Sequence, residues 1–257
     1  MAVVLKSISG IPQPAFPIPK GVVLAQEART ARRRFYPATI LLTTYSLTVL
    51  AFGFATHPAA TAAYLAMGVG FWTLLEYLVH RFVLHGRFPD GPGALRHRMH
   101  TFFDTMHGDH HLRPWDGMYI NGYLDALPFG VLFAIVSFLI GPHYKAPVFV
   151  AGLLQSYVLE EWVHYSVHFC FFKGRYFRYI RYHHWYHHSR RGGEQAFGLT
   201  SGIWDLVSGT QMPTELRFRT RVQRPARPAA VEEEEPQAPL LAPAPEALAS
   251  EPEPKLH

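Results

Sequence analysis

Long apolar stretches alternate with polar, basic segments along this chain of 257 residues. Residues 36–54 and 59–79 form the first two stretches, separated by a short turn at His57 and Pro58. A helix needs about 20 apolar residues to cross a bilayer, so this pair predicts a hairpin of two spans. Residues 124–140 and 147–168 predict a second hairpin, although their shorter apolar cores leave a re-entrant or half-buried hairpin as an alternative. The pattern therefore predicts an all-α integral membrane protein with four transmembrane helices in two hairpins.

The two ends of the chain differ in composition from this middle region. Residues 1–28 are punctuated by Pro and Gly and lack the uninterrupted apolar core that marks a signal peptide. Residues 219–257 are rich in Pro, Ala and Glu, a composition that cannot bury a core, so we expect a disordered tail. The membrane domain is thus expected at residues 29–218, after an N-terminal cytosolic segment.

Basic residues are clustered, and their positions predict the orientation of the helices. Four arginines lie between Arg29 and Arg34, directly before the first apolar stretch, and others follow in the polar segments at residues 86–123 and after 169. The positive-inside rule then places both termini and both polar segments in the cytoplasm. Contact with lipid phosphates explains the arginine cluster beside a membrane span better than nucleic-acid binding does.

Ten of the sixteen histidines fall into four clusters between His80 and His188. HGDHH at residues 107–111 and HWYHH at residues 184–188 each place histidines at i, i+3 and i+4. These positions share one helix face, so the three rings of each motif are expected to point at a common centre. Two pairs, His80 with His85 and His164 with His168, flank the motifs. Because all four clusters lie on one side of the predicted membrane, they can form a single site.

The chemistry expected of this set is metal binding. The single cysteine, Cys170, excludes a cysteine-based zinc or iron–sulfur site. Imidazole suits iron, zinc, copper and nickel, so the ligand type alone leaves the metal open. Ten imidazoles exceed what one ion accepts, which points to two ions.

Neutral ligands leave a two-metal site cationic, so carboxylates are expected to orient the ligands and offset the charge. Glu76 lies one helical turn before His80, and Glu160 and Glu161 lie one turn before His164. His183 faces away from His184, so we expect it behind the ligands rather than on a metal.

Together these motifs resemble the fatty acid hydroxylase superfamily, which is related to the sterol desaturases, and they look most like its fatty acid 2-hydroxylases. The resemblance covers residues 74–205. It is carried by EYLVHRFVLH at 76–85, HGDHH followed by WDG at 115–117, HYSVHF at 164–169, YHHWYHH at 182–188 and FGLTSGIWD at 197–205.

The resemblance implies an oxidoreductase that uses two iron ions and O2 to hydroxylate the carbon beside the carboxyl group of long fatty acids or fatty acyl groups. Zinc could replace iron in a purified form. The fold implied is a four-helix membrane base capped by a cytosolic helical layer. The implied metal ligands are His80, His85, His107, His110, His111, His164, His168, His184, His187 and His188.

Two expectations concern partners and location. Many family members carry a fused cytochrome b5 domain, for which the 35 N-terminal residues here are too short. We therefore expect a separate electron donor, such as cytochrome b5 or a ferredoxin, and a bacterial inner membrane rather than the endoplasmic reticulum. The substrate is expected to be a lipid from the bilayer, with Asp116, Tyr165 and Trp204 in the wall of its site.

Two alternatives remain open. Within the superfamily, the chain could be a sterol or carotenoid hydroxylase or desaturase. A different class, a histidine-rich membrane metal transporter or binding protein, would place ligands along the spans near the midplane. The gathering of histidines on one side favours an active site. His97 matches no motif and is not expected to bind metal.

Overall fold

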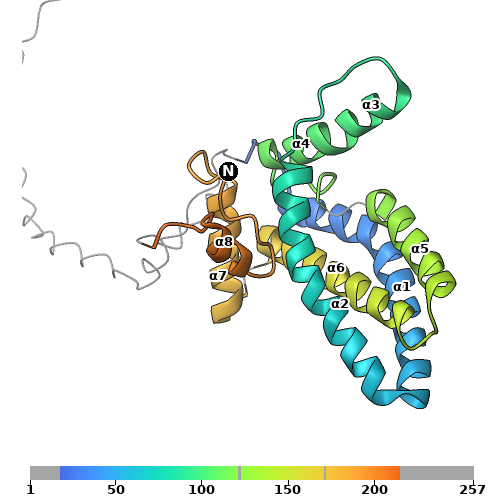
Figure 1. Ribbon diagram of the computed structural model, residues 1–257. Helices are drawn as coiled ribbons and strands as arrows, with labels where there is room; N and C mark the ends of the chain where they lie inside the picture. Colours follow the sequence, from blue (N-terminus) through green and yellow to red (C-terminus); the bar gives the residue numbers. More distant parts are fainter. Residues whose placement is uncertain (1–17, 121–122, 171, 215–257) are drawn as a thin grey trace, which may run out of the picture. The chain divides into compact units, whose positions relative to one another are not determined.

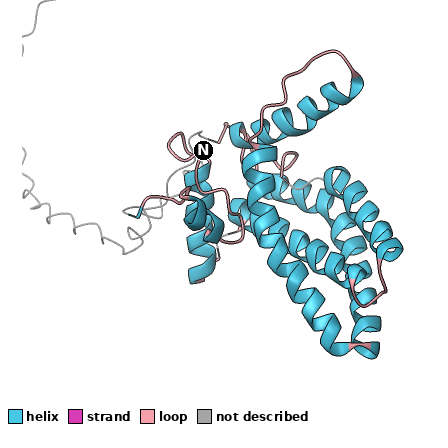
Figure 2. Ribbon diagram, in the orientation of Figure 1, coloured by secondary structure: helices cyan, strands magenta, loops and turns pink. Residues whose placement is uncertain are grey.

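The computed structural model describes residues 18–120, 123–170 and 172–214, and all regular structure in this part of the chain is helical (Figures 1 and 2). The prediction of an all-α fold is thus confirmed for these residues. The predicted tail at residues 219–257 and most of the N-terminal segment lie outside the described residues.

The first predicted hairpin is formed by α1 (Leu24–Thr56) and α2 (Pro58–Leu78). His57 connects them, and Pro58 begins α2 at a position where its missing N–H costs no helical hydrogen bond. Both helices are long and apolar enough to cross a membrane. Their outward faces expose large apolar side chains, among them Ile40, Leu47 and Phe71. Exposed apolar surface of this extent is typical of contact with lipid.

The second hairpin is formed by α5 (Tyr123–Ile140) and α6 (Ala146–Phe169). The apolar part of α5, Leu127–Ile140, is shorter than a full span, and α6 ends in a polar segment with Glu160 and Glu161. α6 packs against α1, α2, α5 and α7, so its polar residues face other helices rather than lipid. Among the described residues, two helices therefore meet the length and apolarity of a span, and a four-span topology stays a prediction.

α2 and α6 cross at a pair of glycines. A Cβ atom on Gly68 would lie 2.2 Å from the carbonyl oxygen of Phe149, and one on Gly152 would lie 2.9 Å from that of Leu65. The two backbones can approach this closely only because neither residue has a side chain. On the other side of α6, Phe35 and Leu42 of α1 pack with Leu154 in a buried apolar cluster.

The polar segments form shorter helices at one end of the bundle. α2 continues directly into a π-helical turn, η1 (Val79–Leu84). α3 (Ala94–Met99), a second π-helical turn η2 (His100–Thr105) and α4 (Met106–Leu112) form one continuous helical segment. α7 (Arg175–His187) packs on α6, and α8 (Ile203–Ser208) packs on α2 (Figure 1).

We expect Gly68→Val to destabilise the protein by about 1–3 kcal/mol, because the added side chain would force α2 away from α6. Thermal unfolding in detergent, followed by size-exclusion chromatography, measures the loss. Gly70→Val is the matched control, since a Cβ on Gly70 meets no atom within 4 Å. Equal stability of the two variants would contradict the close crossing.

Candidate metal centre

The ten predicted histidines converge from four helical segments into two clusters of five. Within each cluster the candidate ligand nitrogens all lie within 4.8 Å of one another. The first cluster contains His80, His85, His107, His111 and His187, and the second contains His110, His164, His168, His184 and His188. The two clusters adjoin, since the rings of His111 and His188 stack with centroids 4.4 Å apart.

Each HxxHH motif is divided between the clusters, so the expectation of one common centre for its three rings is wrong. His107 and His111 belong to the first cluster and His110 to the second, while α7 divides its three histidines the opposite way. The reason is helical geometry: positions i and i+4 lie about 40° apart around the axis, whereas i+3 and i+4 lie about 100° apart. The i and i+4 rings therefore stay together, and the i+3 ring turns to the neighbouring cluster.

The pair His80 and His85 is brought together by the π-helical turn η1. Positions five residues apart point to different sides of an α-helix at 3.6 residues per turn. Here the backbone N–H of His85 donates to the carbonyl of His80 at 3.1 Å, the i→i+5 bond that defines a π turn. This wider turn places both rings in the first cluster, with centroids 5.2 Å apart.

The spacing of the ring nitrogens fits metal ions. His85 Nε2 lies 3.0 Å from both His107 Nε2 and His187 Nε2. In the second cluster, His184 Nε2 lies 2.9 Å from both His168 Nε2 and His188 Nε2. Two nitrogens bound at about 2.0–2.1 Å and at right angles to each other would be about 3 Å apart. A tetrahedral site would use four ligands, so five converging nitrogens indicate a higher coordination number.

The seven cluster histidines that lie outside the helical stretch Pro58–Leu84 and outside α6 are held in the neutral form that binds metal. Burial lowers the pKa of His85 to about 4 and that of His111 to about 3. Burial, together with repulsion from the neighbouring imidazoles, also lowers the pKa well below its ordinary value in His107, His110, His184, His187 and His188. Near neutral pH these rings therefore carry no proton that a metal would have to displace.

A loop at residues 195–200 orients two ligands of the first cluster through its backbone. His187 Nδ1 lies 2.7 Å from the carbonyl oxygen of Gln195, and His80 Nδ1 pairs with the carbonyl oxygen of Phe197. These contacts place the ring proton on Nδ1 and leave Nε2 free to bind metal. Ala196, between the two carbonyls, has a φ of 60°, a left-handed conformation that is uncommon for any residue but glycine.

Two buried carboxylates hold this loop in place. Glu76 accepts hydrogen bonds from the backbone N–H groups of Leu199 and Thr200 and from the Thr200 hydroxyl. Asp205 accepts from the N–H groups of Phe197 and Gly198, both at 2.9 Å. Glu76 thus acts on the ligands through the loop rather than by touching His80, the contact that its spacing in the sequence suggested.

The other residues expected behind the ligands take three different positions. Glu161 lies 3.8 Å from His164 Nδ1, where it can orient this ring. Glu160 accepts a hydrogen bond from Trp72 Nε1 at 2.7 Å. His183 is fully buried, and its Nε2 lies 3.3 Å from the Asp205 carboxylate.

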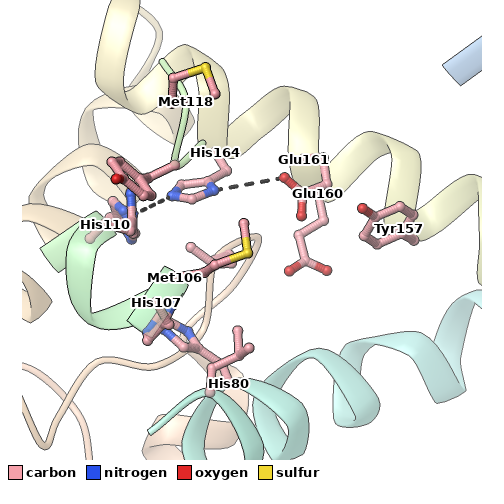
Figure 3. A pocket seen from close by; sticks show the side chains of 13 residues that line it. His80, Met106, His107, His110, Met118, Tyr157, Glu160, Glu161 and His164 are labelled. Atoms are coloured by element: carbon pink, nitrogen blue, oxygen red, sulfur yellow. Dashed lines mark hydrogen bonds and ion pairs between the residues drawn. The ribbon is translucent and has the colours of Figure 1, made fainter. Parts of the chain in front are cut away.

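A cavity of about 150 Å³ adjoins both clusters (Figure 3). Its wall combines histidines of both clusters with Glu160 and Glu161 and with apolar or aromatic side chains, among which are Leu84, Met106, Met118, Tyr119, Tyr157 and Leu199. Figure 3 shows Met106 projecting between His164 and His107. None of these apolar residues was singled out by sequence reasoning, because an apolar residue near a histidine motif gives no signal distinct from ordinary packing.

The three residues expected around the substrate lie outside the wall of this cavity. Asp116 accepts the backbone N–H of Met118 in a turn, Tyr165 packs with Ala31, and Trp204 donates to Thr73 at 3.1 Å. A substrate role for Asp116, Tyr165 and Trp204 stays a prediction. His97 is exposed and pairs with Asp90, away from both clusters.

The chain is similar to known proteins over the region that contains both histidine clusters. The sequence profile described as fatty acid hydroxylase matches residues 65–210, more than half of the chain. The chain is 34% identical over 153 residues to the fatty acid 2-hydroxylase of Rattus norvegicus, covering 58% of this chain and 39% of that protein. It is 33% identical over 147 residues to the dihydroceramide fatty acyl 2-hydroxylase of Arabidopsis thaliana, covering 56% of this chain and 59% of that protein. The matches therefore span less than two thirds of these relatives' lengths.

A solved structure supports the likeness in three dimensions. It is described as full-length scs7p with only the hydroxylase domain visible. It matches this chain with a TM-score of 0.56 and 25% sequence identity, and covers 68% of this chain and 66% of that one.

The role of Glu76 in holding the 195–200 loop can be tested by measuring the metal content of the protein. We expect Glu76→Gln to weaken metal binding by about 10- to 100-fold at the first cluster, because an amide cannot accept all three hydrogen bonds. The second cluster should keep its ion. Elemental analysis of the purified protein after dialysis against a weak chelator measures the loss of one ion and the retention of the other.

Glu194→Gln is the matched control, since Glu194 is exposed next to the same loop. Full metal content in Glu76→Gln would show that the loop does not orient the ligands.

Proposed function

The chain belongs to the fatty acid hydroxylase family, and we propose on this basis that it is a membrane-bound, O2-dependent lipid hydroxylase with two iron ions. Its proposed reaction is hydroxylation of the carbon beside the carboxyl carbon of long-chain fatty acids or fatty acyl groups. The observation that carries this proposal is the pair of adjoining five-histidine clusters beside a partly apolar cavity.

All ten clustered histidines are proposed as metal ligands, five to each ion. Supporting this are the nitrogen spacing near 3 Å and the convergence of five ligand atoms in each cluster. When bound, two redox-active ions would supply the activation of O2. Nitrogen ligands alone do not distinguish iron from zinc, and the proposal of iron follows from the redox reaction, since zinc has no redox chemistry.

The residues around the cavity are proposed to position the acyl group and exclude water. Leu84, Met118 and Leu199 supply apolar wall, which favours a C–H bond over water near the metals. In the balanced reaction, one oxygen atom of O2 enters that C–H bond. The other leaves as water, with two protons and two electrons from a separate electron-transfer protein such as cytochrome b5 or a ferredoxin.

The proposed membrane arrangement places the site at the cytoplasmic end of the helices. Ala31, within the arginine cluster of α1, packs against Tyr165, one residue from His164. The basic cluster and the candidate metal site therefore lie at the same end of the bundle, as the positive-inside rule requires if this end is cytoplasmic. We propose that residues 29–218 form this domain, with both hairpins in a bacterial inner membrane.

We expect His111→Ala and His188→Ala, one from each cluster, to abolish hydroxylation and lower the metal content. Each removes one of five converging nitrogens. His97→Ala should leave the metal content unchanged, because His97 lies in neither cluster and its exposed side chain pairs with Asp90. Metal analysis and product assay of the three purified proteins test the assignment, and full metal and activity in His111→Ala would refute it.

The reaction itself is tested by a lipid mass profile of aerobic cells that express the wild type or His111→Ala with an electron-donor system. We expect lipids with one extra oxygen in the wild type only, with that oxygen on the carbon beside the carboxyl or amide carbon. Growth under ¹⁸O₂ should label it.

Other outcomes separate the alternatives. Loss of two hydrogens would indicate a desaturase, and oxygen on a sterol or carotenoid would indicate the related activities. A change in cellular metal content without any lipid product would favour the transporter.

A further inference from the structure

A second, apolar groove adjoins the metal cavity. It has a volume of about 470 Å³ and runs between the α3–η2 segment and α5. One side of this acyl groove is lined by His97, Arg98, Met99, Thr101 and Phe103, and the other by Phe129 of α5. Among the described residues, Met106 alone lines both the groove and the metal cavity.

The sizes of the two spaces show why a long lipid needs both. A cavity of about 150 Å³ holds a molecule the size of benzene, so the metal cavity can admit the reacting carbon and its carbonyl but no long chain. The groove is within the range of small-molecule pockets. It lies next to the metal cavity and shares Met106 with it.

The outer end of the groove continues into a surface that suits lipid. Phe129, Leu132, Phe133 and Val136 occupy positions i, i+3, i+4 and i+7 of α5 and therefore form one stripe along the helix. These side chains are 54%, 54%, 49% and 37% exposed. An apolar stripe that leads from an apolar helix face to the groove provides a path for an acyl chain but not for a polar ligand.

We propose that the acyl groove binds the hydrocarbon chain of the lipid substrate beyond its reacting carbons, and that Met106 controls passage between this groove and the metal cavity. This inference rests on the proposed function. Methionine suits the position because its unbranched side chain can change rotamer as a chain passes. The side chain of Met106 thereby sets how bulky a substituent can reach the metals.

The experiment uses a dihydroceramide whose acyl chain carries a photoreactive diazirine near its middle, with the full-length protein in nanodiscs. In the wild type we expect labelled peptides to contain residues 97–103 or Phe129. Met106→Trp should lower this labelling and long-chain hydroxylation by about tenfold or more, while metal content stays unchanged. Met67→Trp is the matched control, since Met67 is exposed on α2 and lines neither space.

A second pair of variants covers the case in which Met106→Trp fails to fold. Thr101→Trp fills the groove from an exposed position, and Thr105→Trp adds the same ring to an exposed position of η2 that lines neither space. Only Thr101→Trp should lower labelling and turnover.

Labelling confined to α1 and α2, or unchanged labelling in Met106→Trp and Thr101→Trp, would overturn the groove assignment. The wild-type product assay tests the proposed reaction independently of the groove. Absence of any 2-hydroxy product would contradict the proposed reaction, whereas hydroxylation combined with labelling elsewhere would contradict the groove alone.

Discussion

The convergence of ten buried or partly buried imidazoles is the constraint on which the rest of this structure depends. Nitrogens that face one another at about 3 Å cannot all be satisfied by shared protons, and burial lowers the pKa of rings such as His111, which keeps them from taking up charge. A cation in each cluster resolves both problems. Ligands from η1, α4, α6 and α7 also tie segments of the chain more than 100 residues apart. Metal binding and the folding of the polar cap are therefore expected to be coupled.

The two clusters are supported differently. In the first, backbone carbonyls of the 195–200 loop orient His80 and His187, and the loop in turn is held by Glu76 and Asp205. In the second, the Glu161 carboxylate lies beside His164. A neutral backbone carbonyl is a weaker hydrogen-bond acceptor than a negatively charged carboxylate. The ions of the two clusters would therefore experience different electrostatic fields. The left-handed Ala196 shows that the loop is held in an uncommon conformation, which its hydrogen bonds to two buried carboxylates and to Thr210 maintain.

Position within the bundle also decides what each helix exposes. α1 and α2 present apolar faces outward and were recognisable from hydropathy alone. α6 lies among other helices and can therefore carry Glu160, Glu161, His164 and His168 at its polar end. Hydropathy over a window reports average composition, and it cannot distinguish a short span from a central helix shielded by its neighbours. For this reason the second hairpin is less clearly defined by sequence than the first.

The sequence by itself determined the helical class, the first hairpin, the ten histidines that converge and the family, because helical periodicity and histidine spacing are local properties of a chain. Only the tertiary structure decided how the histidines divide. The i+3 ring of each HxxHH motif belongs to the neighbouring cluster, where histidines from other helices complete the set. The π turn that unites His80 with His85 is invisible in residue spacing. The carbonyls of Gln195 and Phe197 gave no signal, since every residue has a carbonyl and only the folded loop selects which of them meet a histidine. The cavity and the groove that share Met106 also could be recognised only in the folded protein, because their walls come from different helices.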